Sequence, residues 1–253
     1  MSSGRLEGRV AIVTGSARRI GSAIARCLAD EGAAVVVNGR TSGALAEEVA
    51  ADIRSRGGRA IACLADITDP AAARHLVERA VEAFGRLDIL VNNAAVRRPV
   101  RFVDMTLEEW RTIMSVILDG AFICSHAAYP YLKESPCGRI INISGLSAQI
   151  GSFSRSHVVA AKAGLIGFTK ALARECGPDG ITVNCVSPGL IEDKDDPPAD
   201  VAFRRHDLSP ETIPLRRSGH PDEVGRAIVA LCSDDMSYVS GQTIHINGGA
   251  FLW

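Results

Sequence analysis

The chain has 253 residues, of which 47% are hydrophobic, and its formal net charge is −1. This length and apolar content suit one large α/β domain with a substantial core. The near-neutral charge, with no strongly basic segment and no acidic tail, argues against a nucleic-acid partner. The opening residues "MSSGRLEGRV" lack a secretory signal, and no apolar run is long enough to span a bilayer, so we expect a cytoplasmic protein without a membrane partner.

Cysteines and histidines are scattered along the chain. The seven cysteines form no CxxC pair, and the six histidines show no metal-ligand spacing. We therefore expect reduced thiols and no metal site.

Apolar, β-branched runs alternate with helical patterns from one end of the chain to the other. Such runs predict strands that are buried on both faces, at residues 9–15, 33–38, 59–66, 88–94, 138–144, 181–187 and 242–247. The alternation predicts a single-domain Rossmann fold over residues 1–253, with a doubly wound parallel sheet of about seven strands.

Two of the intervening helices have clear start signals. In "TDPAAARHLVERAVEAFG", Asp69 is the expected N-cap, Pro70 the first helical residue and Gly85 the residue after the end. The segment "HPDEVGRAIVALC" repeats this arrangement with Pro221.

Residues 189–220 are rich in proline and charge and form the least regular stretch. A disordered insert is one reading. We favour a substrate loop beside the carboxyl ends of the strands, where ligands of such sheets bind.

The turn "IVTGSARRIGSAIA" joins the first strand to the first helix. Gly15 permits a tight turn, and Gly21 permits close approach of helix and strand. Free N–H groups at the helix start can hold a pyrophosphate, so the turn predicts a dinucleotide site.

Several segments occur together in a familiar order: "TGSARRIG", "LADITD", "VNNAA", "VVAAKAG", "NCVSPG" and "SYVSGQTIHINGG". With them, nearly the whole chain resembles the short-chain dehydrogenases/reductases, and in particular the branch of the 3-oxoacyl-acyl-carrier-protein reductases. The resemblance implies a Rossmann-type domain, a nicotinamide cofactor, a small-molecule substrate and a homodimer or homotetramer.

The resemblance also implies cofactor contacts. Arg19 stands where the family's turn usually has its middle glycine, and Asp193 stands where many members carry a threonine for the nicotinamide carboxamide. Asp66 and Ile67 match the adenine contacts, and Asn92 and Ala94 the contacts beside the ribose and phosphate. The full expected set is Gly15, Ser16, Arg18, Arg19, Ile20, Gly21, Asn38, Gly39, Arg40, Asp66, Ile67, Asn92, Ala94, Lys162, Pro188, Gly189 and Ile191.

The end of the second strand, "VVVNGR", indicates which nicotinamide is bound. A carboxylate there would bind the ribose 2′-hydroxyl of NAD, but the position holds Gly39, flanked by Asn38 and Arg40. Arg18 and Arg19 lie in the nearby turn. Solvated surface arginines are the alternative, but guanidinium groups beside a missing acid favour NADP(H).

The catalytic set departs from the family pattern of asparagine, serine, tyrosine and lysine. The lysine is Lys162, within an apolar helical pattern, and the resemblance implies that it reaches the nicotinamide ribose. The other positions hold Ile117, Gly145 and Val158. Ser147, His157 and Asp193 are the nearby polar substitutes.

In the family the tyrosine donates the proton, and without it two functions remain open for this chain. One is an NADPH-dependent oxidoreductase that passes hydride to an acceptor needing little proton assistance, namely an imine or iminium, a quinone or an activated C=C bond. The alternative is a non-catalytic NADP(H)-binding subunit or regulator.

Overall fold

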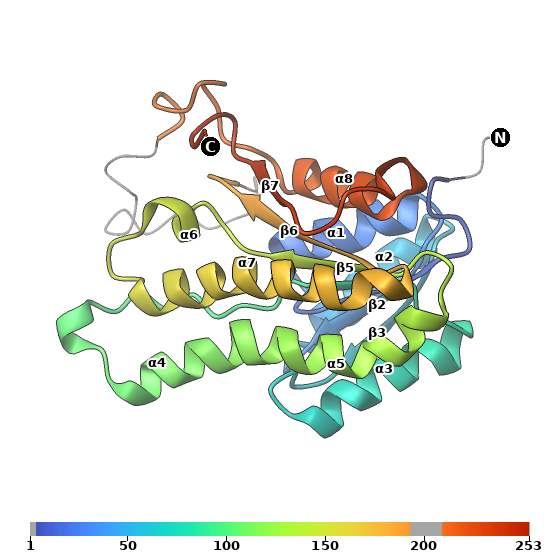
Figure 1. Ribbon diagram of the computed structural model, residues 1–253. Helices are drawn as coiled ribbons and strands as arrows, with labels where there is room; N and C mark the ends of the chain where they lie inside the picture. Colours follow the sequence, from blue (N-terminus) through green and yellow to red (C-terminus); the bar gives the residue numbers. More distant parts are fainter. Residues whose placement is uncertain (1–3, 193–208, 253) are drawn as a thin grey trace.

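Seven parallel strands form one sheet in a computed structural model that describes residues 4–192 and 209–252 (Figure 1). The strand order is β3-β2-β1-β4-β5-β6-β7. The bounds are β1 Val10–Val13, β2 Ala34–Gly39, β3 Arg59–Leu64, β4 Ile89–Asn92, β5 Arg139–Ile143, β6 Thr182–Pro188 and β7 Thr243–Ile246. Each of the seven predicted strands is confirmed, although most are shorter than predicted and β2 and β6 end one residue later. The doubly wound parallel sheet is also confirmed.

Helices cover both faces of the sheet. The longer ones are α1 Arg19–Asp30, α2 Gly43–Ser55, α3 Pro70–Phe84, α4 Leu107–Met114, α5 Gly120–Glu134, α7 Ser156–Cys176 and α8 Pro221–Cys232. Short turns of helix are η1 Phe102–Asp104, η2 Ser115–Asp119, α6 Ser147–Ile150, η3 Gly177–Asp179 and η5 Asp234–Met236. Figure 1 shows α1, α2 and α8 on one side of the sheet and α3, α5 and α7 on the other.

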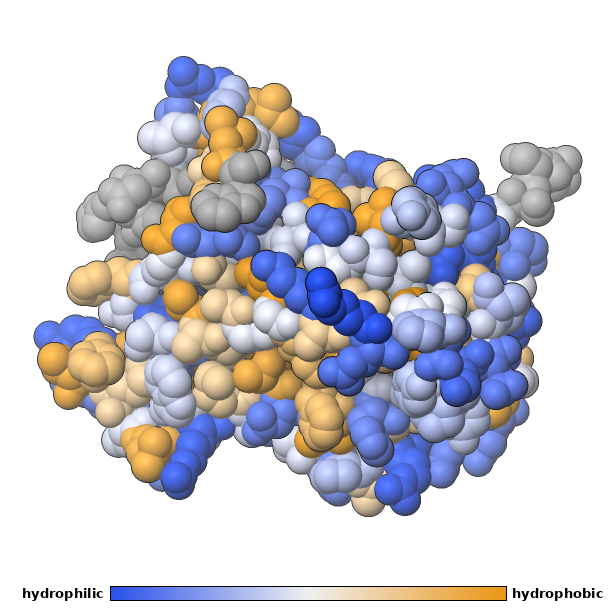
Figure 2. Space-filling view, viewed as in Figure 1, coloured by the Kyte–Doolittle hydropathy of each residue, from blue (hydrophilic) through white to orange (hydrophobic). Residues whose placement is uncertain are grey.

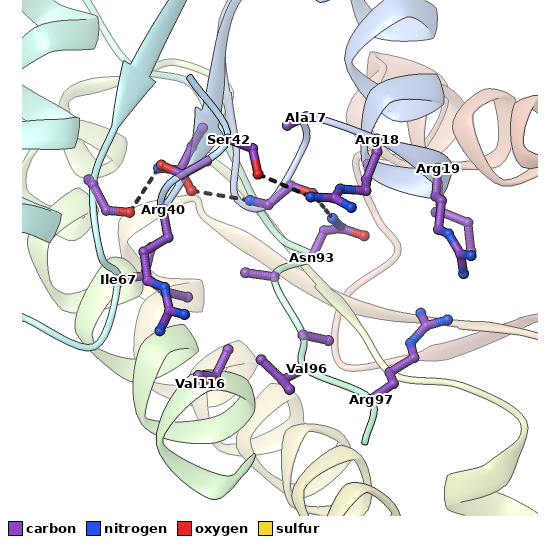
Figure 3. Close-up of a pocket in the computed structure, with 18 of the residues that line it drawn as sticks. Ala17, Arg18, Arg19, Arg40, Ser42, Ile67, Asn93, Val96, Arg97 and Val116 are labelled. Carbon is purple, nitrogen blue, oxygen red and sulfur yellow. Dashed lines mark hydrogen bonds between the residues drawn. The ribbon is translucent and has the colours of Figure 1, made fainter. Parts of the chain in front are cut away.

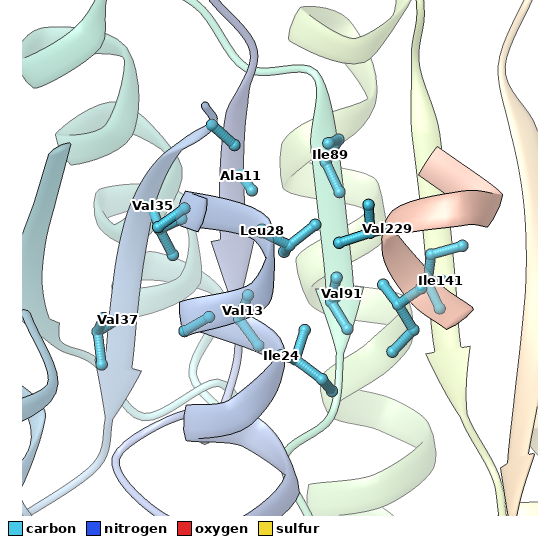
Figure 4. Packing of buried hydrophobic residues seen from close by; sticks show 14 of the residues in the cluster. Ala11, Val13, Ile24, Leu28, Val35, Val37, Ile89, Val91, Ile141 and Val229 are labelled. Carbon is cyan, nitrogen blue, oxygen red and sulfur yellow. The ribbon is translucent and has the colours of Figure 1, made fainter. Parts of the chain in front are cut away.

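Alternate residues along each strand supply the two halves of the core. Val13, Val35 and Val91 point toward α1 and α8, where they meet Leu28 and Val229 (Figure 4). The intervening residues of the same strands, such as Ile12 and Val36, pack under α3 and α5. Full burial on both faces explains why the central strand β1 is apolar along its whole length, whereas the edge strands β3 and β7 are partly exposed.

The predicted helix signals are also confirmed. The Asp69 side chain accepts from the Ala71 N–H at 2.9 Å, and Gly85 ends α3 in the left-handed region at φ +84°. At α8, His220 is the N-cap and Pro221 is the first helical residue.

The run Leu107–Glu134, made of α4, η2 and α5, is long and apolar enough to cross a membrane by length and composition alone. In the fold, α5 packs against α3 and β4, and α4 packs against α7, so the run is part of the layer that covers the sheet. Its middle turn, η2, is a π-helix, a wider turn that often occurs at functional sites.

Candidate active site

A cleft of about 440 Å³ opens where β1, β2 and β4 end (Figure 3). Its walls are the turn after β1, the end of β2, the segments after β3 and β4, and Val116 of η2. Parallel strands present their carboxyl ends at this edge, and α/β sheets bind ligands there.

The turn after β1 needs both of its predicted glycines. Gly15 has φ +60°, and a Cβ on it would lie 2.8 Å from Cα of Ala94. A Cβ on Gly21 would lie 2.5 Å from the Gly15 carbonyl oxygen. Between them, Arg19 takes a left-handed backbone conformation at φ +54°, which favours glycine. The backbone of this turn therefore has the conformation of a glycine-rich turn, although residue 19 is an arginine.

One end of the cleft carries basic and hydroxyl groups beside Gly39. Arg18 donates from Nη2 to the Ser42 hydroxyl at 3.1 Å, and Arg40 lies 3.8 Å from the Asp66 carboxylate. The Thr68 N–H donates to the Asp66 carboxylate at 3.0 Å. This hydrogen bond is the main reason why the pKa of Asp66 lies below its usual value. A Cβ on Gly39 would make only ordinary contacts, the nearest at 3.7 Å from Cβ of Ala17. A phosphate could therefore approach this end with no competing acid at position 39.

Asn38 and Ser16 hold the turn in shape from behind. Asn38 Oδ1 accepts from the Gly15 N–H at 3.1 Å while lining the cleft. Ser16, which we expected at the cofactor, is instead fully buried: its hydroxyl donates to the Val13 carbonyl and accepts from the Asn38 N–H. The Ser16 side chain is therefore not among the described lining residues of the cleft, because it points into the turn.

Asn92 was also predicted at the cofactor, but its neighbour Asn93 lines the cleft. The Asn92 amide donates to the side chains of Ser125 and Asn142, at 3.1 and 2.9 Å. Asn142 in turn donates to the Thr169 hydroxyl at 2.9 Å, so these buried groups link β4 and β5 to α5 and α7. The Asn93 amide donates to the Thr14 and Gly15 carbonyls.

Most of the other predicted cofactor residues line this cleft together: Gly15, Arg18, Arg19, Ile20, Gly21, Asn38, Gly39, Arg40, Asp66, Ile67, Ala94 and Ile191. Lys162, Pro188 and Gly189 are not among its lining residues. Apart from Ile191, which was expected under the nicotinamide, the residues that line the cleft are those predicted around the adenosine and the phosphates.

Lys162 is buried on the sheet side of α7. Its Nζ donates to the carbonyls of Ile143 and Ser144, at 2.8 and 2.7 Å, and the Ser144 hydroxyl donates back to the Lys162 carbonyl at 2.9 Å. Burial, and to a smaller degree the charge of Arg97, lowers the pKa of Lys162 to about 7. The lysine is thus poised between ammonium and amine near neutral pH.

Apolar groups surround the region where a tyrosine and an asparagine were expected. Ile117 and Val158 belong to one buried cluster with Ile113 and Leu165, against which Val96 of the cleft wall also packs. Neither Ile117 nor Val158 can donate a proton. A Cβ on Gly145 would make only ordinary contacts: it would lie 3.8 Å from Cδ of Lys162 and 3.9 Å from the Ser147 hydroxyl.

The three substitute candidates have different surroundings. Ser147, in the short helix α6, is brought beside Gly145 and therefore close to Lys162. His157 is fully buried, and neither ring nitrogen has a hydrogen-bond partner among the residues that the structure describes. Asp193 and the middle of the predicted substrate loop 189–220, residues 193–208, lie outside the described residues.

The structure adds lining residues that the sequence reasoning missed, including Ser42, Asn93, Val96, Arg97 and Val116. Asn93, Val96 and Arg97 directly follow β4. The rule that ligands bind beyond the carboxyl ends of strands was the available signal for them.

Fold and cleft together define a dinucleotide-binding α/β protein of the Rossmann type. Residues 15–250 match the family described as enoyl-(acyl carrier protein) reductase. The chain therefore belongs to the short-chain dehydrogenase/reductase family, a family of oxidoreductases.

Named relatives agree with this assignment. The chain is 38% identical to a 3-oxoacyl-[acyl-carrier-protein] reductase of Synechocystis sp., over 98% of this chain and 99% of the relative. It is also 38% identical to a protein of the same name from Staphylococcus aureus, over 96% and 98% of the two chains. A short-chain dehydrogenase from Burkholderia cenocepacia, solved in complex with NADP, is 37% identical and superposes with a TM-score of 0.89, covering 97% of this chain and 99% of that one.

Proposed function

We propose that the chain is an NADPH-dependent oxidoreductase with an incomplete catalytic set, acting on an acceptor that needs little proton assistance. The observation that carries this proposal is the apolar cluster around Ile117 and Val158, next to the bare backbone of Gly145. Lys162 is the one titratable side chain among these four positions.

The described residues fit the phosphates of NADP(H). The turn from Gly15 to Gly21 presents backbone N–H groups at the start of α1, as a pyrophosphate requires. Arg18, Ser42 and Arg40 offer donors beside Gly39, where the 2′-phosphate would lie. The NADP complex of the Burkholderia relative supports the same choice of cofactor.

When bound, NADPH supplies the hydride. The chain's own residues then have to position the acceptor and stabilise or neutralise the negative charge that develops on it. Positioning of two reactants alone is worth effective molarities of about 10⁵–10⁸ M, whereas a general acid contributes about 10²–10⁴-fold. The apolar cluster can position an acceptor but cannot protonate a developing alkoxide.

These residues narrow the acceptor class. A simple ketone, or the 3-oxoacyl group for which the relatives are named, develops charge on oxygen and would react slowly here. An iminium, a quinone or an activated C=C bond develops less charge at the tyrosine position. Lys162, whose pKa is lowered to about 7, is the available proton donor for such an acceptor.

A decisive experiment measures NADPH oxidation against a matched panel: a cyclic iminium, a benzoquinone, an enone and the saturated ketone of the same skeleton. We expect turnover of at least one of the first three and little turnover of the ketone. Equal or faster ketone reduction would contradict the proposal.

One observation favours the non-catalytic alternative. Lys162 donates two hydrogen bonds to buried carbonyls and is not among the described lining residues of the cleft. A chain that binds NADPH tightly but turns over none of the panel would be such a binding subunit or regulator.

We also propose a homodimer or homotetramer in the cytoplasm. Only 39% of the most apolar window in Leu107–Glu134 is buried, and Phe122 of α5 is 54% exposed. Figure 2 shows apolar side chains gathered over α5 and α7 on this face. Light scattering after gel filtration would give the mass, and a monomer at micromolar concentration would contradict the proposal.

A further inference from the structure

Four arginines line the cleft (Figure 3). Arg18 and Arg40 lie at the end where the proposed function places the 2′-phosphate. Arg19 and Arg97 come from opposite walls, one from the start of α1 and the other from the segment after β4. Their guanidinium groups point toward one another.

The backbone of Arg19 is held in a conformation that an arginine rarely adopts. Its φ of +54° would suit the glycine that the family's turn usually has at this place. Strained residues persist where surrounding structure enforces them, and they cluster at ligand sites. The left-handed turn directs the Arg19 side chain to the cleft.

Arg97 lies next to the apolar region around Val158. Its neighbour Val96 packs against the buried cluster that contains Ile117 and Val158, and both Val96 and Arg97 line the cleft. The pair of arginines therefore lies between the phosphate turn and this apolar region. The charge of Arg97 also contributes, less than burial does, to the lowered pKa of Lys162.

We propose that Arg19 and Arg97 form an anion-binding pair that holds an anionic oxygen group, phosphate or carboxylate, between them. Two guanidinium groups offer planar, permanently charged donors that match either group. The group has two possible sources: the pyrophosphate of the dinucleotide, or a carboxylate on the acceptor. Both sources rest on the proposed function, but the anion site itself can be tested without it.

The matched variants are Arg97→Gln and Arg98→Gln. Both remove one positive charge from adjacent positions. Both residues are exposed. Arg97 lines the cleft, whereas Arg98, which pairs with Glu109 at 2.8 Å, is not among the described lining residues. Arg19→Gly is a second test of the pair. Thermal unfolding of each variant shows whether it is folded.

Inorganic pyrophosphate titrated into the cofactor-free protein tests the pair directly. We expect the Kd to rise about tenfold or more for Arg97→Gln and Arg19→Gly, and to stay unchanged for Arg98→Gln, because a charge-assisted hydrogen bond is lost in the first two. If wild-type protein did not bind NADPH, the proposed function would be wrong. The pyrophosphate titration would still show whether Arg19 and Arg97 bind an anion.

Further probes distinguish the sources. If the anion is the cofactor's pyrophosphate, Arg97→Gln weakens NADPH binding but leaves adenosine 2′-monophosphate binding unchanged. If it is the acceptor's carboxylate, NADPH binding is unchanged, and NADPH-loaded protein loses affinity for cinnamate while cinnamamide binds weakly to every variant. The proposal is overturned if Arg97→Gln and Arg98→Gln behave alike with pyrophosphate, NADPH and cinnamate.

Discussion

Gly145 and Lys162 face each other across an ordinary van der Waals gap: a Cβ on the glycine would lie 3.8 Å from Cδ of the lysine. The glycine is therefore not required by crowding, and a serine could be built there without displacing the lysine. The absence of a hydroxyl at this position is a chemical property of the site.

This relationship leads to a restoration experiment. The triple variant Ile117→Asn, Gly145→Ser, Val158→Tyr should reduce a simple ketone measurably, because it restores a polarising hydroxyl and an acid next to Lys162. NADPH oxidation with ethyl acetoacetate measures the gain. The same variant with Val158→Phe has the ring without the hydroxyl and should remain inactive. Wild-type turnover of the ketone at about 1–10³ s⁻¹, a usual enzyme rate, would show that the acid lies elsewhere.

Cofactor preference should depend on position 39. We expect wild-type protein to bind NADPH more tightly than NADH, and Gly39→Asp to reverse the order, because the new carboxylate would repel the 2′-phosphate and accept from a ribose hydroxyl. Calorimetric titration of both cofactors at fixed salt gives the two Kd values. Gly39→Ala is the steric control, since it adds a Cβ without a charge. Equal affinity of wild-type protein for both cofactors would contradict the assignment.

Lys162→Met should affect both stability and cofactor binding. The buried carbonyls of Ile143 and Ser144 would each lose a donor, which costs about 1–3 kcal/mol of unfolding free energy. If the lysine also reaches the nicotinamide ribose, NADPH binding should weaken by roughly 1.5–3 kcal/mol. Denaturant unfolding and NADPH titration measure the two effects. An unchanged NADPH Kd would mean that the lysine serves the fold alone.

The same lysine predicts a pH dependence. Its pKa is about 7 in the folded protein and would return to its ordinary value of 10.5 on unfolding, so between these values the unfolded chain binds more protons. Its contribution to the unfolding free energy therefore rises with pH over this range. The stability of wild type relative to Lys162→Met should be greater at pH 8.5 than at pH 7. Lys170→Met, at an exposed position of α7, should track wild type at both values.

Arg19→Gly should stabilise the cofactor-free protein by about 0.5–1 kcal/mol, because glycine adopts the left-handed turn without strain. Arg19→Ala removes the charge but keeps a Cβ at φ +54°, so it should not share the gain. Chemical unfolding of the three proteins separates the backbone effect from the charge effect. Equal stability of the glycine and alanine variants would argue against strain at this residue.

Sequence reasoning predicted the strands and the glycine turn because each depends on local chemistry: apolar runs, Gly15 and Gly21. It was less successful with adjacent residues whose side chains diverge. Asn92 and Asn93 are both short amides at the end of β4, and only the packing decides which one joins the buried network. Ser16 is a similar case: it was predicted at the cofactor, but its side chain points into the turn. Arg97 could not be placed because a loop after a strand has no periodicity that gives its direction.

The amide and hydroxyl chain from Asn92 through Asn142 to Thr169 also has a dynamic consequence. It ties two central strands to α7 with short, buried hydrogen bonds, so α7 cannot slide along the sheet without breaking them. The backbone amides of β4, β5 and this part of α7 should exchange with solvent as one slow unit. The hydrogen-bonded chain would therefore keep α7, and with it Val158 and Lys162, at a fixed distance from the strand ends that border the cleft.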